Sequence, residues 1–178
     1  KPIDKKLLNK LDSCSFEGIK YLNSLIYGYN FKKYQKIRDK IARKTNWTLG
    51  FDKLLIKLMK EYSIIFISSG MKDINEAKLK EIYFNSNNIL GNEFKIEKGK
   101  IEDSNLVVSD ELKGYIIKKL KKDYGVIAIG HSLGDKAMLD NANISISVNS
   151  KIRNLAKFNV KAPDEILRIV KKYVVKLK

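Results

Sequence analysis

The stretch VIAIGHSLGDKAMLDNA, residues 126–142, decides the fold class of this chain. Its apolar start is typical of a buried strand, which ends at Gly130 in a turn that carries Asp135 before an amphipathic helix. Ligands of α/β proteins bind beyond the carboxyl ends of the strands, and an acidic turn in this place usually faces a metal ion or a phosphate. We therefore expect a functional site at residues 130–135.

Strands and helices alternate on both sides of this stretch. Besides the strand and helix within it, the patterns predict strands at 63–69 and 144–148, a hairpin at 83–108, and helices at 51–62, 110–124 and 164–177. Asp73 and Glu76 also predict a capping box that opens a helix over 74–82. Apolar strands separated by helices favour a parallel sheet with helices on both faces, an α/β fold.

The N-terminal part of the chain has a different pattern. Apolar residues recur there at spacings of three and four, as in amphipathic helices, with breaks at Gly28 and Asn30. They are Leu7, Leu8, Leu11, Phe16, Ile19, Leu22, Leu25, Ile26, Phe31, Tyr34, Ile37 and Ile41. The sequence thus predicts a helical, cap-like segment over residues 1–48 and an α/β core over residues 49–178.

Residues 126–142 resemble the fourth motif of the haloacid dehalogenase (HAD) superfamily, in its phosphoserine phosphatase branch. That motif has a strand, then Gly-Asp-Gly-x-Asn-Asp, then x-x-Met-Leu and a small residue. The matching positions are Gly130, Asp135, Met138, Leu139 and Ala142. The first aspartate of the motif falls on His131, so the fourth motif is degenerate here.

The resemblance continues upstream. IIFISSGM, residues 64–71, is similar to the second motif, and it places the phosphate-binding hydroxyl at Ser68. Residues 91–101 resemble the hairpin between the second and third motifs, and Lys113-Gly114 resembles the third-motif lysine at the start of its helix. The resemblance implies a HAD-like, Rossmann-like parallel sheet with a small helical cap at the N-terminus.

The resemblance also implies a phosphatase site for phosphorylated small molecules. Lys113 would contact the phosphate, Ser68 and the backbone at Ser69 and Gly70 would donate hydrogen bonds to it, and Asp135 would bind Mg²⁺. His131, as a second metal ligand, would weaken Mg²⁺ binding, because Mg²⁺ prefers oxygen ligands over imidazole.

Each of these residues also has a structural interpretation. Ser68 would only cap a turn, Lys113 would be a solvated lysine of its helix, and Asp135 would be a helix N-cap. His131 would be a hydrogen-bonded structural residue. A further alternative takes Asp135 as the first acid of the fourth motif and Asp140 as the second.

The first motif of the family, an Asp-x-Asp nucleophile after an apolar strand, has no match before residue 50. Asp4 follows no apolar strand, Asp12 lies in a helical pattern, and Asp52 opens a helix. The nucleophile is therefore either lost or encoded upstream of Lys1, and we expect the 178 residues as written to be inactive as a phosphatase.

Composition adds a third hypothesis. Thirty-six Lys and Arg against twenty Asp and Glu give a net charge of +16, which attracts polyanions such as nucleic acid or a ribonucleoprotein. The lysines are spread along helices, which favours a solvated face instead. No stretch is long and apolar enough to span a bilayer, and a lone cysteine, Cys14, is consistent with the cytoplasm.

Three functions therefore remain open from the sequence. The chain is a Mg²⁺-dependent phosphomonoester phosphatase completed by an upstream Asp-x-Asp strand, a catalytically silent relative that serves as a binding or scaffolding module, or a basic protein that binds nucleic acid or a ribonucleoprotein.

Overall fold

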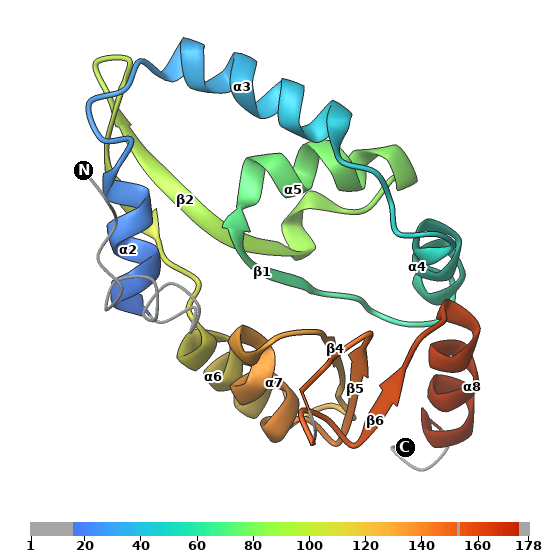
Figure 1. Ribbon diagram of the computed structural model, residues 1–178. Helices are drawn as coiled ribbons and strands as arrows, with labels where there is room; N and C mark the ends of the chain where they lie inside the picture. Colours follow the sequence, from blue (N-terminus) through green and yellow to red (C-terminus); the bar gives the residue numbers. More distant parts are fainter. Residues whose placement is uncertain (1–15, 153, 175–178) are drawn as a thin grey trace. The chain divides into compact units, whose positions relative to one another are not determined.

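The computed structural model of the chain describes residues 16–152 and 154–174 (Figure 1). The leucines of the first expected helix, Leu7, Leu8 and Leu11, lie outside the described residues. The chain divides into two compact units, and the boundary between them lies between Val108 and Ser109. Each unit is described by itself.

The first unit combines helices with a three-stranded sheet of order β1-β2-β3, in which β1 and β2 are parallel and β3 is antiparallel to β2. Its elements are α2 (Phe16–Ser24), α3 (Phe31–Lys44), α4 (Phe51–Met59), β1 (Phe66–Met71), α5 (Lys72–Leu79), the 3₁₀ turns η1 (Lys80–Ile82) and η2 (Ser86–Asn88), β2 (Ile89–Glu97) and β3 (Lys100–Leu106). The predicted hairpin at 83–108 is thus confirmed, and the helical pattern on either side of Gly28 and Asn30 corresponds to α2 and α3.

The hairpin between β2 and β3 holds the N-terminal helices in this unit. Its turn needs positive φ at Lys98 and at Gly99, where φ is 76°, and glycine adopts this conformation at no steric cost. The backbone of the α2–α3 connection bonds to it, because Gly28 N–H donates to the carbonyl of Ile101 at 2.6 Å and Phe31 N–H to that of Gly99 at 2.9 Å.

Helix α5 begins directly after β1, and the predicted capping box is wrong. The helix starts at Lys72, and Met71 is its N-cap with no side-chain bond. Asp73 instead accepts the hydroxyl proton of Tyr34 on α3 at 2.9 Å. This cross-helix bond is a long-range contact, which local sequence pattern does not report.

An apolar cluster fixes the position of α5 against the sheet. Its buried members are Leu79, Ile82, Phe84 and Ile89, and partly buried residues between α3 and the start of β1 pack on it. These partly buried neighbours are Trp47, Leu55, Met59, Ile64 and Phe66. The β1–α5 connection therefore starts from this packed cluster, and the cluster holds the residues at the end of β1 in place.

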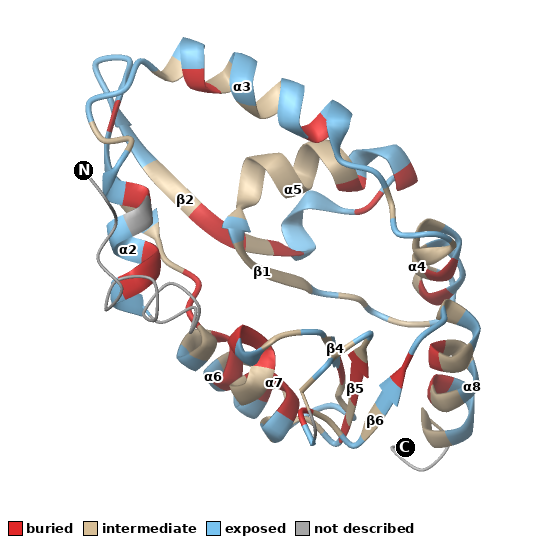
Figure 2. Ribbon diagram, viewed as in Figure 1, coloured by how far each residue is buried: buried red, intermediate tan, exposed pale blue. Residues whose placement is uncertain are grey.

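The second unit has the alternation that residues 126–142 predict. Its elements are α6 (Asp110–Leu120), β4 (Ile127–Gly130), the 3₁₀ turn η3 (Leu133–Asp135), α7 (Lys136–Asn141), β5 (Ile144–Val148), β6 (Phe158–Val160) and α8 (Pro163–Val174). The strands form an all-parallel sheet of order β4-β5-β6, and the buried residues in Figure 2 lie on this sheet and on the inner faces of its helices.

Glycine at position 91 sets how closely β2 approaches the start of α5. A Cβ atom at Gly91 would lie 2.8 Å from Cα of Lys72 and 3.0 Å from the carbonyl oxygen of Gly70. Both are backbone atoms, so no side-chain rotation relieves the overlap, and the end of β1 would have to shift.

Gly91→Ala should therefore destabilise the protein by about 1–3 kcal/mol, the usual cost of overpacking. Urea denaturation followed by circular dichroism measures this loss. Glu102→Ala, at an exposed position on β3 of the same unit, is the matched control and should change little. Equal stability of the two variants would show that β2 and α5 separate easily.

Candidate functional site

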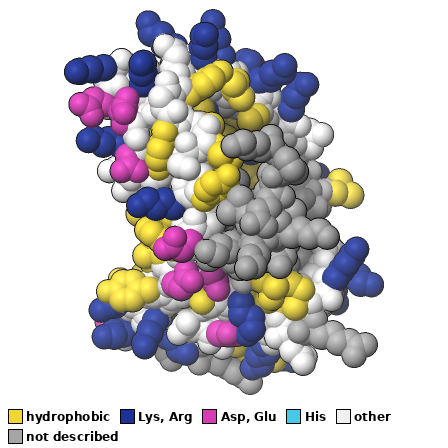
Figure 3. All heavy atoms as spheres, turned by 60° about the vertical axis from the view of Figure 1, so that its left-hand side comes forward, with side chains coloured by type: hydrophobic (Ala, Val, Ile, Leu, Met, Phe, Trp, Pro, Cys, Tyr) yellow, Lys and Arg dark blue, Asp and Glu magenta, His cyan; other side chains and the backbone are white. Residues whose placement is uncertain are grey.

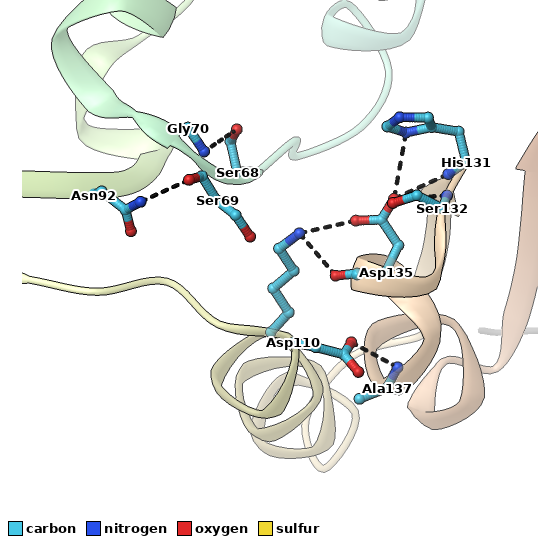
Figure 4. Close-up of polar contacts among 11 residues, drawn as sticks. Ser68, Ser69, Gly70, Asn92, Asp110, His131, Ser132, Asp135 and Ala137 are labelled. Carbon is cyan, nitrogen blue, oxygen red and sulfur yellow. Dashed lines mark hydrogen bonds and ion pairs between the residues drawn. The ribbon is translucent and has the colours of Figure 1, made fainter. Parts of the chain in front are cut away.

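The end of β1 carries two adjacent serines in different roles (Figure 4). The Oγ atom of Ser68 accepts the backbone N–H of Gly70 at 3.0 Å, which caps the turn. The Oγ atom of Ser69 is buried, and it has no hydrogen-bond partner among the described residues. A buried hydroxyl without a partner costs about 1–3 kcal/mol, so the Ser69 hydroxyl has both its donor and its acceptor capacity unused among the described residues.

A second unused group lies next to the same turn. Nδ2 of Asn75, on α5, is also buried without a partner among the described residues. It lies 3.7 Å from the place that a Cβ atom of Gly70 would occupy. Two polar atoms that have no partner in the described part of the chain therefore lie near Gly70.

Asn92 on β2 fixes the Ser69 backbone. Its side chain is 2% exposed, and its Nδ2 donates to the carbonyl of Ser69 at 2.6 Å while its Oδ1 accepts the N–H of Val108 at 2.7 Å. Sequence reasoning missed this residue. The available signal was a lone amide within the strand segment ILGNEF, where a buried polar residue needs a defined partner.

In the second unit, Lys113 is a buried lysine. The residue is 4% exposed, and its ammonium donates to the carbonyl of Gly134 and to Oδ1 of Asp135, each at 2.9 Å. These contacts use two of the three donors of a lysine ammonium. The interpretation of Lys113 as a solvated surface lysine is therefore excluded.

The close approach of α6 and α7 makes this contact geometrically possible. A Cβ atom at Gly114 would lie 2.7 Å from Cβ of Ala137, so only glycine fits between the two helices. Asp110, at the start of α6, accepts the N–H of Ala137 at 2.9 Å. Burial is the main cause that raises the pKa of Asp110.

Asp135 is surrounded by hydrogen-bond donors (Figure 4). Its Oδ2 accepts the backbone N–H of His131 at 3.0 Å and that of Ser132 at 3.3 Å, while Oδ1 accepts Lys113. Burial alone would raise the pKa of Asp135, but these N–H groups and the Lys113 ammonium outweigh it, so the pKa lies below its usual value. The carboxylate is ionised and turns back to the 131–132 backbone, and it does not cap α7.

His131 lies beside this carboxylate without enclosing a metal site. Its side chain is 77% exposed, and Nδ1 is 3.4 Å from Oδ2 of Asp135. Mg²⁺ needs about six oxygen ligands in octahedral geometry. Among the described residues no group of three or more His, Cys, Asp or Glu side chains is placed to hold a metal ion. The residues around Asp135 therefore do not fit Mg²⁺.

The alternative acid, Asp140, points elsewhere. Its carboxylate forms an ion pair with Lys136, one turn earlier on α7, and its side chain is 53% exposed. The structure thus brings Lys113, His131 and Asp135 together in the second unit, and Ser68, Ser69 and Gly70 together in the first.

Comparisons with known proteins agree with the fold. No protein-family model and no curated protein matches the sequence. Among solved structures, a phosphoserine phosphatase from T. onnurineus in complex with NDSB-201 is 21% identical, with a TM-score of 0.69 and coverage of 94% of this chain and 80% of that one.

Two further solved structures give similar values. A phosphoserine phosphatase solved as a phospho-aspartyl intermediate analogue is 19% identical, with a TM-score of 0.71 and coverage of 96% of this chain and 84% of that one. A phosphoserine phosphohydrolase-like protein from Francisella tularensis is 18% identical, with a TM-score of 0.70 and coverage of 93% and 83%. The chain therefore has the HAD-like α/β fold of the phosphoserine phosphatases.

Proposed function

We propose that this chain is a phosphatase-like protein that binds phosphomonoesters, and that Ser69, Gly70 and Lys113 contribute to phosphate binding. The observation that carries this proposal is the buried Ser69 hydroxyl near the carboxyl end of β1, which has no hydrogen-bond partner within residues 16–152 and 154–174. In parallel sheets this is the edge at which ligands bind, and a phosphate oxygen would supply the missing acceptor.

The roles of the neighbouring residues follow from their contacts. Ser68 supports the turn, because its Oγ already accepts the Gly70 N–H. Lys113 has one ammonium donor beyond those that Gly134 and Asp135 accept, and a charge-assisted hydrogen bond to a phosphate oxygen would use it. Asp135 serves to orient Lys113. Mg²⁺ is not part of the proposed binding site.

Hydrolysis would need a further group, a carboxylate that accepts the phosphoryl group. In the described part of the chain, Asp135 accepts three N–H or ammonium donors and Asp110 accepts the Ala137 N–H. Both oxygens of Asp135 and one oxygen of Asp110 therefore already accept hydrogen bonds. We propose that phosphomonoester hydrolysis, if it occurs, depends on an Asp-x-Asp strand outside these 178 residues. A cytoplasmic location remains part of this proposal.

The nucleic-acid hypothesis rests on net charge alone. On the face in Figure 3, Lys and Arg side chains lie among acidic and apolar ones. In the described part of the chain, no helix is both long and apolar enough to cross a bilayer. A phosphorylated small molecule remains the proposed partner.

Calorimetric titration with inorganic phosphate and with glycerol 1-phosphate tests the proposal. We expect Lys113→Arg, which keeps a cation, to bind, and Lys113→Gln to lose about tenfold to hundredfold in affinity, the equivalent of one charged hydrogen bond. Lys118→Gln, at an exposed position on the same helix, is the control. Addition of Mg²⁺ or of a chelator should leave the affinity unchanged. Equal binding by Lys113→Gln and Lys118→Gln would remove Lys113 from the proposed site.

A further inference from the structure

A small pocket opens within the first unit, next to the end of β1. Its volume is about 260 Å³, and α3, the β1–α5 connection and β2 enclose it. It is lined by Phe31, Met71, Lys72, Asp73, Glu76, Asn92, Glu93 and Phe94. Pockets for drug-sized ligands usually measure about 300–1,000 Å³, so this pocket suits a molecule smaller than a nucleotide.

The net charge of the pocket lining is opposite in sign to that of the whole chain. The whole chain has 36 basic and 20 acidic residues, whereas the pocket lining has three acids, Asp73, Glu76 and Glu93, and one base, Lys72. Three negative charges and one positive charge leave a net charge of −2 in the lining. A lining of this charge favours a cation over an anion.

Glu76 is the acid with the least neutralised charge. Lys72 lies 2.8 Å from Oε1 of Glu93 but 3.9 Å from Oε1 of Glu76. Asp73 accepts the Tyr34 hydroxyl at 2.9 Å and lies 3.6 Å from the Arg38 guanidinium. The hydrogen bond from Lys72 lowers the pKa of Glu93, so this acid also remains ionised at neutral pH.

Two aromatic side chains, Phe31 and Phe94, also line the pocket. Tyr34 stacks on Phe31 with ring centroids 5.9 Å apart and meets Phe94 edge-on at 5.6 Å, which fixes both phenylalanines. Aromatic faces attract ammonium groups, and carboxylates nearby add to this attraction. A carboxylate on the ligand would instead meet like charges.

The pocket adjoins the proposed phosphate-binding turn in the sequence. Two of its lining residues, Met71 and Lys72, directly follow Gly70. A third, Asn92 on β2, donates a hydrogen bond to the Ser69 carbonyl. Asn92 therefore contacts both the pocket and the Ser69 backbone, and a small ligand that spans the two would have its phosphate at Ser69 and Gly70 and its other end in the pocket.

We propose that this pocket binds the ammonium group of a small amino-alcohol phosphate, with Glu76 as its main carboxylate partner, and that it disfavours a ligand that carries an additional carboxylate. This inference rests on the proposed phosphate-binding function and specifies its substrate class. Phosphoethanolamine is the simplest ligand with this chemistry.

Calorimetric titrations of the 178-residue chain with phosphoethanolamine, phosphoserine, glycerol 1-phosphate and inorganic phosphate test the inference. Phosphoethanolamine should bind about tenfold more tightly than glycerol 1-phosphate, and more tightly than phosphoserine. Glu76→Gln should lower the affinity for phosphoethanolamine about fivefold to tenfold and leave that for glycerol 1-phosphate unchanged. The control Glu102→Gln, an exposed glutamate on β3, should bind like the wild type.

The outcomes separate the two proposals. If phosphate binds but phosphoethanolamine has no advantage over glycerol 1-phosphate, or Glu76→Gln weakens both equally, the inference is overturned and the proposed function stands. If no phosphate compound binds, the proposed function fails. Ethanolamine alone, titrated by NMR, then decides the inference, because shifts of the Glu93 and Phe94 amides that vanish in Glu76→Gln support it and their absence overturns it.

Discussion

Replacing Lys113 with methionine should lower the free energy of unfolding by about 3 kcal/mol, at the lower end of the 3–5 kcal/mol typical of a broken buried ion pair. The ammonium is buried, and its loss leaves Oδ1 of Asp135 and the carbonyl of Gly134 without their donor. The N–H groups of His131 and Ser132 still bond the other carboxylate oxygen, so the cost stays at the lower end.

The pH dependence of this loss has a defined sign. Since the folded-state pKa of Asp135 is lowered, its contribution to stability is present above the unfolded value, about 3.9, and is lost as the pH falls through the folded pKa. The difference between the wild type and Lys113→Met should therefore be full at pH 7 and shrink below about pH 4, because a protonated Asp135 no longer needs the ammonium.

Urea denaturation at pH 7 and at pH 3.5 measures both parts of this prediction. Lys118→Met, at an exposed position on α6, is the control and should match the wild type within about 0.5 kcal/mol. If Lys113→Met were as stable as Lys118→Met at pH 7, the ion pair with Asp135 would contribute nothing to the fold.

The chain of 178 residues should not hydrolyse para-nitrophenyl phosphate or phosphoserine above background, with or without Mg²⁺. Loss of a covalent nucleophile removes the reaction path and does not merely slow it. Asp135 accepts the Lys113 ammonium and Asp110 accepts the Ala137 N–H, and burial raises the pKa of Asp110.

Single-turnover and steady-state assays of the wild type and of His131→Asp check this prediction. His131→Asp adds a carboxylate at the fourth motif but no nucleophile, so it should also be inactive. Ser69→Ala is the control for a contaminating phosphatase, because a contaminant would give the same turnover in the preparations of this variant and of the wild type. Mg²⁺-dependent turnover by the wild type that Ser69→Ala abolishes would contradict the prediction and would require a nucleophile among these residues.

The sequence predicted the fold because its strongest signals are local. VIAIG, followed by a glycine turn and DKAMLDNA, became β4, η3 and α7, and the Gly99 turn became the hairpin between β2 and β3. These elements depend on apolar periodicity and turn chemistry, which a single sequence contains. The hydrogen bond between Tyr34 and Asp73, which is present in place of the expected capping box, joins residues 39 positions apart. No local sequence pattern reports such a contact.

The site was predictable only in part. Ser68 and Ser69 are neighbours on one strand, so pattern alone does not tell which hydroxyl is buried without a partner among the described residues; our proposal of Ser69 for phosphate binding rests on that difference. Lys113 is one of many helical lysines, and its burial accompanies tertiary contacts of α6 with the 134–137 segment, which a local pattern does not report. The acidic pocket is lined by residues from α3, α5 and β2. Its acidic side chains come from separate segments of the sequence, so the excess of negative charge is visible only in the folded chain.

Phosphate titration of Ser69→Ala beside Ser68→Ala tests the central claim most directly. The two variants remove the same atom one residue apart, and ³¹P NMR or calorimetry reports the affinity for inorganic phosphate. We predict that Ser69→Ala weakens binding about fivefold to tenfold, the worth of one hydrogen bond, whereas Ser68→Ala, which loses only a turn contact, binds nearly as the wild type. Wild-type affinity in Ser69→Ala, or no saturable phosphate binding by the wild type, would contradict the account.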